Sequence, residues 1–271
     1  MGTTAQKLQN IIDSKAAISA AIEAKGGTVP TELTGYGAAI EALPSGGGSS
    51  DLAAKIIDGS VTEVTAADLS GATSIRNYGF HQCYDLSSIT LPSSLTIIGS
   101  YAFQNCSSLK SIDIPNPVTK IGASAFNGCS SLSSVTITNS TNFDGTQIFS
   151  NCNELKSIVI PNLVTKLGQG IFSNCRSLSS VTVPSSVTSI DASVFSGCSS
   201  LTSIIFQGTL TSINGYNNFQ GCSSCLIFDF SSATAVPTLA NTNAFQNTNP
   251  SKKIIVPDEL YDSWKAANNW N

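Results

Sequence analysis

The sequence is poor in charge: Asp, Glu, Lys and Arg make up 11% of its 271 residues, and the formal net charge is -4 at pH 7. So few basic residues form no stripe that would hold a nucleic acid or an anionic membrane surface. There is also no run of 18 apolar residues, the length that a membrane-spanning helix needs. We therefore expect no nucleic-acid partner and no insertion into a membrane.

Catalytic and metal-binding patterns are equally scarce. His81 is the only histidine, and the chain contains none of the common motifs of hydrolases, metalloproteases or nucleotide-binding loops. The one Cys-x-x-Cys pair ends at Cys225, where other copies of a repeated unit carry leucine, so we interpret it as a core substitution. The sequence predicts a protein that is not an enzyme and uses neither a metal nor another cofactor.

One repeated unit dominates the chain. Phenylalanine followed three residues later by cysteine recurs from Phe80 to Phe219, with a spacing of 23 residues five times and then 24. An eighth copy, at Phe245, has Thr248 in place of the cysteine. A fixed period in the twenties is typical of a solenoid, in which each unit buries its apolar side only against its neighbours.

The unit itself predicts local structure. Leu-x-x-Ile-x-Ile, as at Leu109–Ile114, alternates apolar and polar residues and predicts a strand with one buried side; stacked copies predict a parallel sheet. The following Val-x-x-Ile segment returns along the opposite side. A glycine four residues before most of the phenylalanines, such as Gly122, predicts a positive φ, and Ala-Phe-x-x-Cys predicts a helical turn. Residues 139–144 depart from the pattern and predict a bulge.

Seven cysteines share one position of the unit and are therefore expected to stack as a ladder. Equivalent side chains in a stack point in parallel directions, which fits disulfide geometry poorly. We predict free, buried thiols that serve as small apolar side chains. This structural ladder comprises Cys83, Cys106, Cys129, Cys152, Cys175, Cys198 and Cys222.

The ends of the chain differ from the repeats. Helical periodicity predicts a hairpin within residues 1–43, which either docks and oligomerises through residues 3–43 or packs on itself or on the solenoid. A Gly/Ser linker (44–50), the solenoid (51–257) and a helical cap (258–271) with Leu260, Tyr261 and Trp264 turned inward complete the predicted organisation. No basic segment followed by an apolar one begins the chain, so folding in the cytoplasm and removal of a signal both remain open.

The repeated unit, most clearly from Leu109 to Cys129, resembles the BspA-like (Treponema-type) leucine-rich repeats over about residues 75–257. The resemblance implies a leucine-rich repeat solenoid with 23-residue repeats and a parallel β-sheet on one face, here preceded by a small α-helical hairpin. It also implies adhesion at a bacterial cell surface and transfers no catalytic residue. Residues 8–40 resemble a helical segment common in phage tail proteins, which would place the chain on a virion.

The outward positions of the predicted strands form the candidate binding face. Thirteen of eighteen such positions in six repeats are Ser or Thr, which either merely suit an exposed strand or form a shallow polar surface for a glycan or a weak contact. Aromatic residues and arginine, which favour tight protein binding, are absent there. The candidate binding residues are Lys110, Asp113, Lys156, Val159, Thr182 and Ile205.

These observations predict a non-enzymatic recognition protein for a cell-surface protein or glycan. We expect a phage tail-associated or fibre-like receptor-binding component that is assembled in the cytoplasm and located on the virion. Two alternatives remain: a secreted adhesin of BspA type at the extracellular cell surface, and a purely structural spacer.

Overall fold

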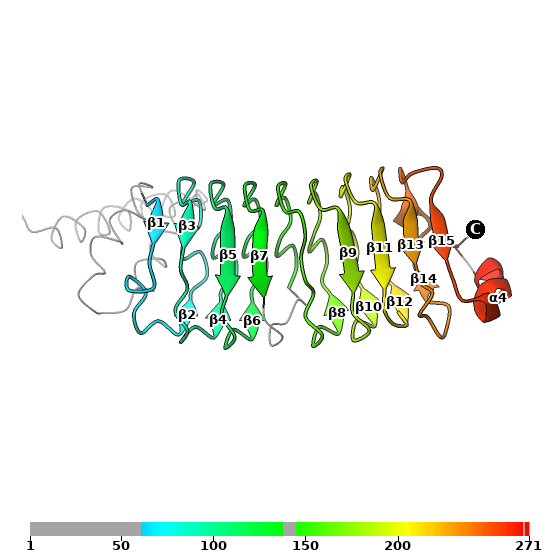
Figure 1. Ribbon diagram of the computed structural model, residues 1–271, viewed down its shortest axis with the longest axis horizontal. Coiled ribbons are helices and arrows are strands. Elements are labelled where there is room, and N and C mark those ends of the chain that lie inside the picture. The colour runs from blue at the N-terminus through cyan, green and yellow to red at the C-terminus, as the bar shows by residue number, and fades with distance from the viewer. Residues whose placement is uncertain (1–60, 138–144, 268, 271) are drawn as a thin grey trace, which may run out of the picture.

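The protein is a solenoid of short coils stacked along one axis, as the computed structural model shows for residues 61–137, 145–267, 269 and 270 (Figure 1). Strand pairings join residues one repeat apart, so the 23-residue units of the sequence correspond to successive coils. The predicted solenoid with a parallel sheet is thereby confirmed. The predicted hairpin (1–43), linker (44–50) and bulge (139–144) lie outside the described residues.

In the described part of the chain, eight strands line one side of the stack, which we call the main face. They are β1 (Glu63–Val64), β3 (Ser88–Ile89), β5 (Ser111–Ile114), β7 (Ser134–Ile137), β9 (Ser180–Val183), β11 (Ser203–Phe206), β13 (Ile227–Asp229) and β15 (Lys253–Ile255). Apolar and polar residues alternate along these strands, and this alternation decides which side chains face the core. In β5 the two isoleucines are buried, and the serine and the aspartate are exposed. Every pairing is parallel, and β5 aligns Asp113 with Thr136 of β7.

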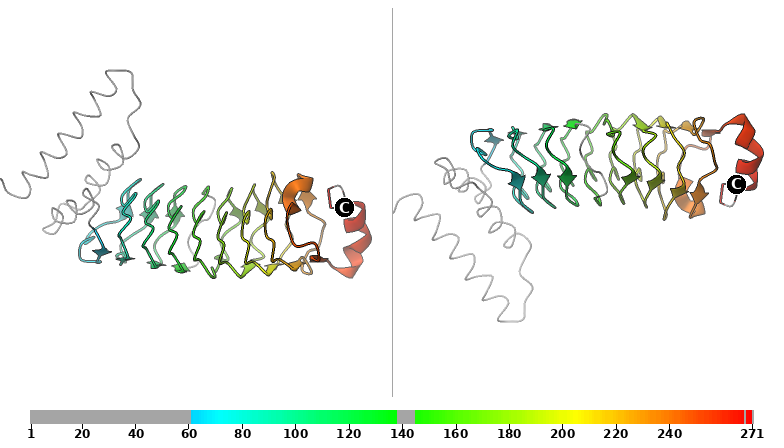
Figure 2. Two further views of the ribbon diagram at one scale, coloured as in Figure 1. Left: turned by 90° about the horizontal axis from the view of Figure 1, so that it is seen from above. Right: turned by 90° about the horizontal axis from the view of Figure 1, so that it is seen from below.

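A second series of two-residue strands, which the sequence did not predict as a sheet, forms where the Val-x-x-Ile segments return; we call its outer side the second face. These strands are β2 (Ser74–Ile75), β4 (Ile97–Ile98), β6 (Lys120–Ile121), β8 (Lys166–Leu167), β10 (Ser189–Ile190), β12 (Ser212–Ile213) and β14 (Thr238–Leu239). They pair in two parallel groups, β2 to β6 and β8 to β14. Figure 2 shows the two strand series on different sides of the stack.

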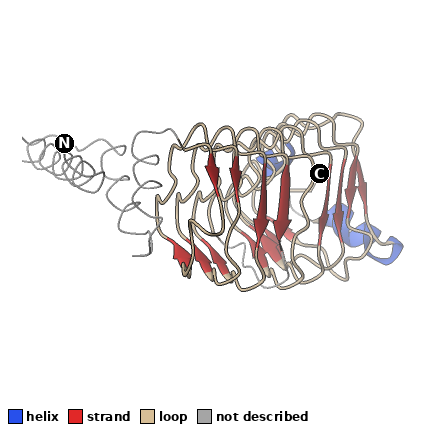
Figure 3. Ribbon diagram, turned by 60° about the vertical axis from the view of Figure 1, so that its left-hand side comes forward, coloured by secondary structure: helices blue, strands red, loops and turns tan. Residues whose placement is uncertain are grey.

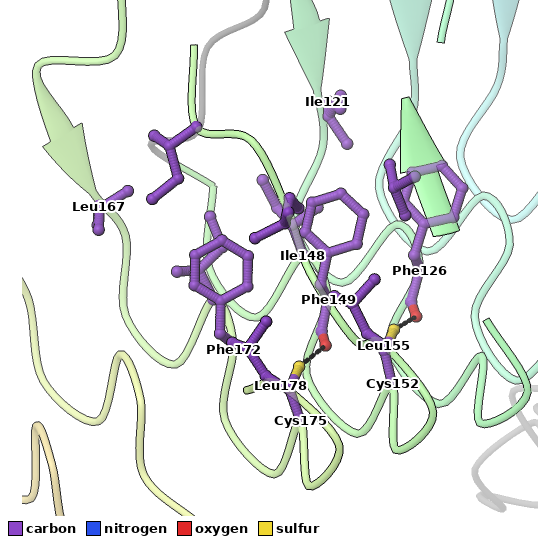
Figure 4. Close-up of a cluster of buried hydrophobic side chains, with 14 of the residues drawn as sticks. Ile121, Phe126, Ile148, Phe149, Cys152, Leu155, Leu167, Phe172, Cys175 and Leu178 are labelled. Atoms are coloured by element: carbon purple, nitrogen blue, oxygen red, sulfur yellow. Dashed lines mark hydrogen bonds between the residues drawn. The ribbon is translucent and has the colours of Figure 1, made fainter. Parts of the chain in front are cut away.

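Stacked phenylalanines fill the space between the faces. The rings of Phe80, Phe103 and Phe126 are fully enclosed and nearly parallel, with centroids 5.2 Å apart at each step. Farther along the stack the spacing widens, to 6.1 Å between Phe149 and Phe172. Figure 4 shows the rings of Phe126, Phe149 and Phe172 close to leucines and cysteines of the core. Each coil is too thin to bury its own apolar residues, so the core is one continuous column.

The Phe-x-x-Cys corner is a run of tight turns, and the predicted helical turn is wrong. Within one corner the N–H groups of Gln104 and Cys106 donate to carbonyls three residues earlier, while Tyr101 and Asn105 have φ near +60°. Residues with a left-handed backbone conformation on both sides of the phenylalanine end any helix after one turn. They also leave the Phe103 N–H free to donate to the next coil, at Ala125 O (2.7 Å).

Glycine occurs four residues before the phenylalanine for a different reason from the positive φ that the sequence predicted. Among the described glycines at this position, only Gly215 has a positive φ, of 69°. Instead, a Cβ on Gly122 would lie 2.3 Å from the backbone nitrogen of Ser100, and one on Gly99 would lie 2.5 Å from the backbone carbon of Arg76. At Gly99 and Gly122, glycine is needed because the adjacent coil approaches too closely for a side chain.

The C-terminal end is closed by η1 (Thr242–Phe245), η2 (Asp258–Leu260) and α4 (Tyr261–Ala266), and Figure 3 shows α4 beyond the last strands. Trp264 is buried as predicted and Leu260 is partly buried, but Tyr261 is 57% exposed, so its predicted inward position is wrong. The 3₁₀ turn of η2 has three residues per turn, which shifts the apolar side of the following helix from where a continuous α-helix would place it. Within the described ranges, no helix is long and apolar enough to cross a membrane.

Candidate binding surface

All six predicted binding residues lie on the main face with exposed side chains. They fall into two rows because each coil repeats the same frame. Lys110 and Lys156 belong to the row seven residues after the phenylalanine, and the other four belong to the row ten residues after it: Asp113, Val159, Thr182 and Ile205. Thr182 and Ile205 are direct register partners in β9 and β11. The sequence therefore placed these residues on one surface.

Many hydroxyls of the first row are engaged by the fold itself. Ser133 Oγ donates to Lys110 O (3.1 Å), Ser179 Oγ donates to Lys156 O (3.3 Å), and Thr202 Oγ1 donates to Ser179 O (2.9 Å). Each bond joins a hydroxyl to the backbone of the preceding coil, so these residues stabilise the stack.

The main face is interrupted between β7 and β9. Residues 157–160 form no strand there, although β9 and β11 form a regular ladder next to them. A shallow groove with a volume of about 270 Å³ lies at this interruption. It is lined by Ser157, Ile158, Val159, Ile160, Asn162, Ser180, Thr182, Pro184 and Gln207.

The groove offers aliphatic and neutral polar groups to a partner. Val159 lines it with 74% of its surface exposed, and Thr182 lies on the neighbouring coil. Asn162 and Gln207 add amide groups that our sequence interpretation missed. One signal was available in the sequence, because Gln207 occupies the position of the prolines that follow β5 and β9, Pro115 and Pro184.

The cysteine ladder lies inside the solenoid, away from this surface. All eight cysteines are free and buried. Cys106 Sγ donates to Phe80 O (3.0 Å), and the same bond to the preceding coil recurs up to Cys222, whose Sγ is 3.1 Å from Phe195 O; Figure 4 shows two of these bonds. At the eighth copy, the Thr248 hydroxyl donates instead to its own coil, at Phe245 O (2.7 Å).

Burial makes these thiols chemically inert. Desolvation raises the pKa of Cys129 and that of Cys175 to about 12, and it raises the pKa of Cys225 to about 11. Because the thiolate is the nucleophile and the metal ligand, a thiol that stays protonated at neutral pH does neither kind of chemistry. Among the described residues, no group of three or more His, Cys, Asp or Glu side chains could hold a metal ion.

Comparison with protein families identifies the repeats. The family model described as BspA type leucine-rich repeat region (6 copies) matches residues 73–191 and 145–267, which together are more than half of the chain. The chain belongs to the BspA type leucine-rich repeat family. The family and its solenoid fold are those of binding modules, and this agrees with the absence of catalytic motifs from the sequence.

One of the solved structures that resemble this chain supports the same fold. A leucine-rich repeat protein from T. pallidum is 29% identical with a TM-score of 0.56, and the match covers 61% of this chain and 78% of that protein. A leucine-rich cell surface protein from Faecalibacterium prausnitzii A2-165 is 23% identical with a TM-score of 0.43, over 80% of this chain and 65% of that one. A leucine-rich repeat protein from Bacteroides ovatus ATCC 8483 is 22% identical with a TM-score of 0.38, over 72% of this chain and 75% of that one. A comparison with curated proteins finds no match.

Proposed function

We propose that this BspA type protein is a non-enzymatic adhesin module that binds a protein partner through its main face. The observation that carries the proposal is the groove at residues 157–160, where Val159 is 74% exposed. Val159 is the most exposed large apolar side chain among the described residues, and it interrupts a row that is otherwise rich in hydroxyls, so it offers an apolar contact that the hydroxyls lack. Ile205, which is 41% exposed on the main face, adds a second apolar contact.

The composition of the groove favours a polypeptide over a sugar. Protein interfaces combine an apolar centre with a rim of satisfied polar groups, and Val159 with Asn162 and Gln207 fits that arrangement. Among the described residues that line the groove, none is an aromatic side chain on which a sugar ring could stack. A single shallow groove binds weakly, so several copies displayed together would raise the overall affinity.

Location on a bacterial cell surface is the part of the proposal that rests on the family. The expected location on a virion drew on residues 8–40, which lie outside the described residues, and none of the comparisons supports it. We therefore favour the adhesin alternative over the phage tail component. Docking or self-association through residues 3–43 is retained as a proposal, because it would supply the multiple copies.

A matched pair of surface variants tests the proposal. Val159→Asp should weaken binding of a multimerised full chain to purified extracellular proteins roughly tenfold, because it places a charge in the apolar centre of the contact. Ile97→Asp is the control, since Ile97 is 42% exposed on the second face and carries a side chain of similar chemistry. Binding is measured on protein and glycan arrays and on whole cells.

The outcomes of these measurements separate the candidate functions. Loss of protein binding with Val159→Asp and retention with Ile97→Asp would support an adhesin that uses the main face. Binding confined to glycans, or equal losses with both variants, would overturn it. Absence of binding on both arrays and on cells would leave only the spacer.

A further inference from the structure

A second concave site lies at the C-terminal end of the solenoid, away from the groove on the main face. It has a volume of about 220 Å³ and is lined by Ile254, Val256, Tyr261, Trp264, Lys265 and Trp270. The two aliphatic residues come from β15 and the residue that follows it, and the others come from α4 and the C-terminal segment. Figure 1 shows β15 and α4 next to each other at this end.

The aromatic walls of the pocket are held in place before any ligand arrives. Trp270 Nε1 donates to Pro237 O (3.0 Å), which fixes its indole against the end of the solenoid. The Trp264 ring lies 5.3 Å from that of Trp270 and 5.5 Å from that of Phe230. A rigid apolar wall lowers the ordering cost of binding. The site is therefore an organised pocket and not merely a loose gap under the cap.

One polar group gives the pocket its chemical preference. The side chain of Lys265 is exposed and forms no ion pair with any described residue. Trp264 Nε1 is buried, so the Trp264 indole contributes apolar surface to the pocket and no accessible N–H group. The Lys265 ammonium therefore favours a ligand that carries negative charge.

We propose that this pocket binds a small aromatic carboxylate. A cavity of about 150 Å³ lined by apolar residues accepts benzene, so the volume of about 220 Å³ found here has room for one ring and a short acidic side chain. The ring packs against the indoles and the aliphatic floor, and the carboxylate is attracted to the Lys265 ammonium. This site is separate from the proposed adhesin surface, and either one can exist without the other.

The chain supplies its own reporter, because its two tryptophans, Trp264 and Trp270, both line the pocket. Titration of the full chain with phenylacetate should change tryptophan emission saturably, with a dissociation constant on the order of 1 mM for so small a ligand. Phenylacetamide, which has the same ring but no charge, should bind roughly tenfold more weakly.

Variants of two neighbouring lysines make the test specific. Lys265→Ala should weaken phenylacetate binding roughly tenfold and bring it to the level of the amide. Lys253→Ala, which changes an exposed lysine of β15 outside the pocket, should leave binding unchanged. Thermal unfolding of both variants checks that the cap is intact. No saturable emission change with phenylacetate, or equal affinities for the acid and the amide, would overturn the proposal.

Discussion

Replacing Phe103 with alanine is expected to destabilise the protein by about 4 kcal/mol, because a fully enclosed ring is removed from the middle of the core column. The ring of Phe103 lies 5.2 Å from those of both Phe80 and Phe126, so neither side can close the space without breaking its own stack. The backbone of this residue also accepts the Cys129 thiol, which ties it to the next coil. The decrease in the free energy of unfolding is measured by urea denaturation that is monitored by far-UV circular dichroism.

A conservative variant separates the loss of packing from general damage. Phe103→Leu keeps most of the apolar volume and should cost about 1.5 kcal/mol. Equal losses for the alanine and leucine variants would show that the stacked ring itself, and not the filled volume, is what stabilises the core. A loss below about 1 kcal/mol for Phe103→Ala would contradict the enclosed column that we describe.

Gly122→Ala is expected to cost about 3 kcal/mol, although alanine is the smallest possible change at this position. The new Cβ would lie 2.3 Å from Ser100 N and 2.6 Å from Gly99 C. Both atoms belong to the backbone of the preceding coil, which cannot turn away as a flexible side chain would. The two coils must therefore move apart, and the hydrogen bonds between them lengthen.

The matched control for this variant is Asp191→Ala. Asp191 has the same position in a later coil and already carries a Cβ, so the alanine removes only an exposed ion pair with Lys166, of length 2.9 Å. Surface ion pairs contribute about 1 kcal/mol or less. If Gly122→Ala proved as mild as Asp191→Ala, close backbone approach would not be the reason for the glycine.

The repeat period made most of the fold predictable from the sequence. A constant spacing of 23 residues puts equivalent residues on adjacent coils, so the register of Asp113 with Thr136 follows from counting. The two-residue period of the strands then decides which side chains face outward. This is why the six candidate binding residues were all placed on one surface before the fold was known.

Features that depend on contacts between coils were not predictable in the same way. The glycines four residues before the phenylalanines suggested a positive φ. Their actual role was not visible, because the sequence of a repeat does not reveal how closely the next coil approaches its backbone. Residues 157–160 read Ser-Ile-Val-Ile, much like the Ser-Val-Thr-Val of β9, yet only β9 joins the ladder. Asn162 and Gln207 were missed because they come from different coils and meet only in the folded groove.

The central claim is that the main face is the surface that binds a partner, and selective blocking of one face tests it most directly. The native thiols are buried and protonated at neutral pH, so a single cysteine introduced on the surface can be labelled alone with a bulky polyethylene glycol maleimide. Thr182→Cys places the label on the main face, and Lys120→Cys places it on the second face. We predict that labelling at Thr182→Cys abolishes binding to the proteins recognised on the array, whereas labelling at Lys120→Cys leaves it unchanged. Full binding by the Thr182→Cys conjugate would contradict the assignment of the main face.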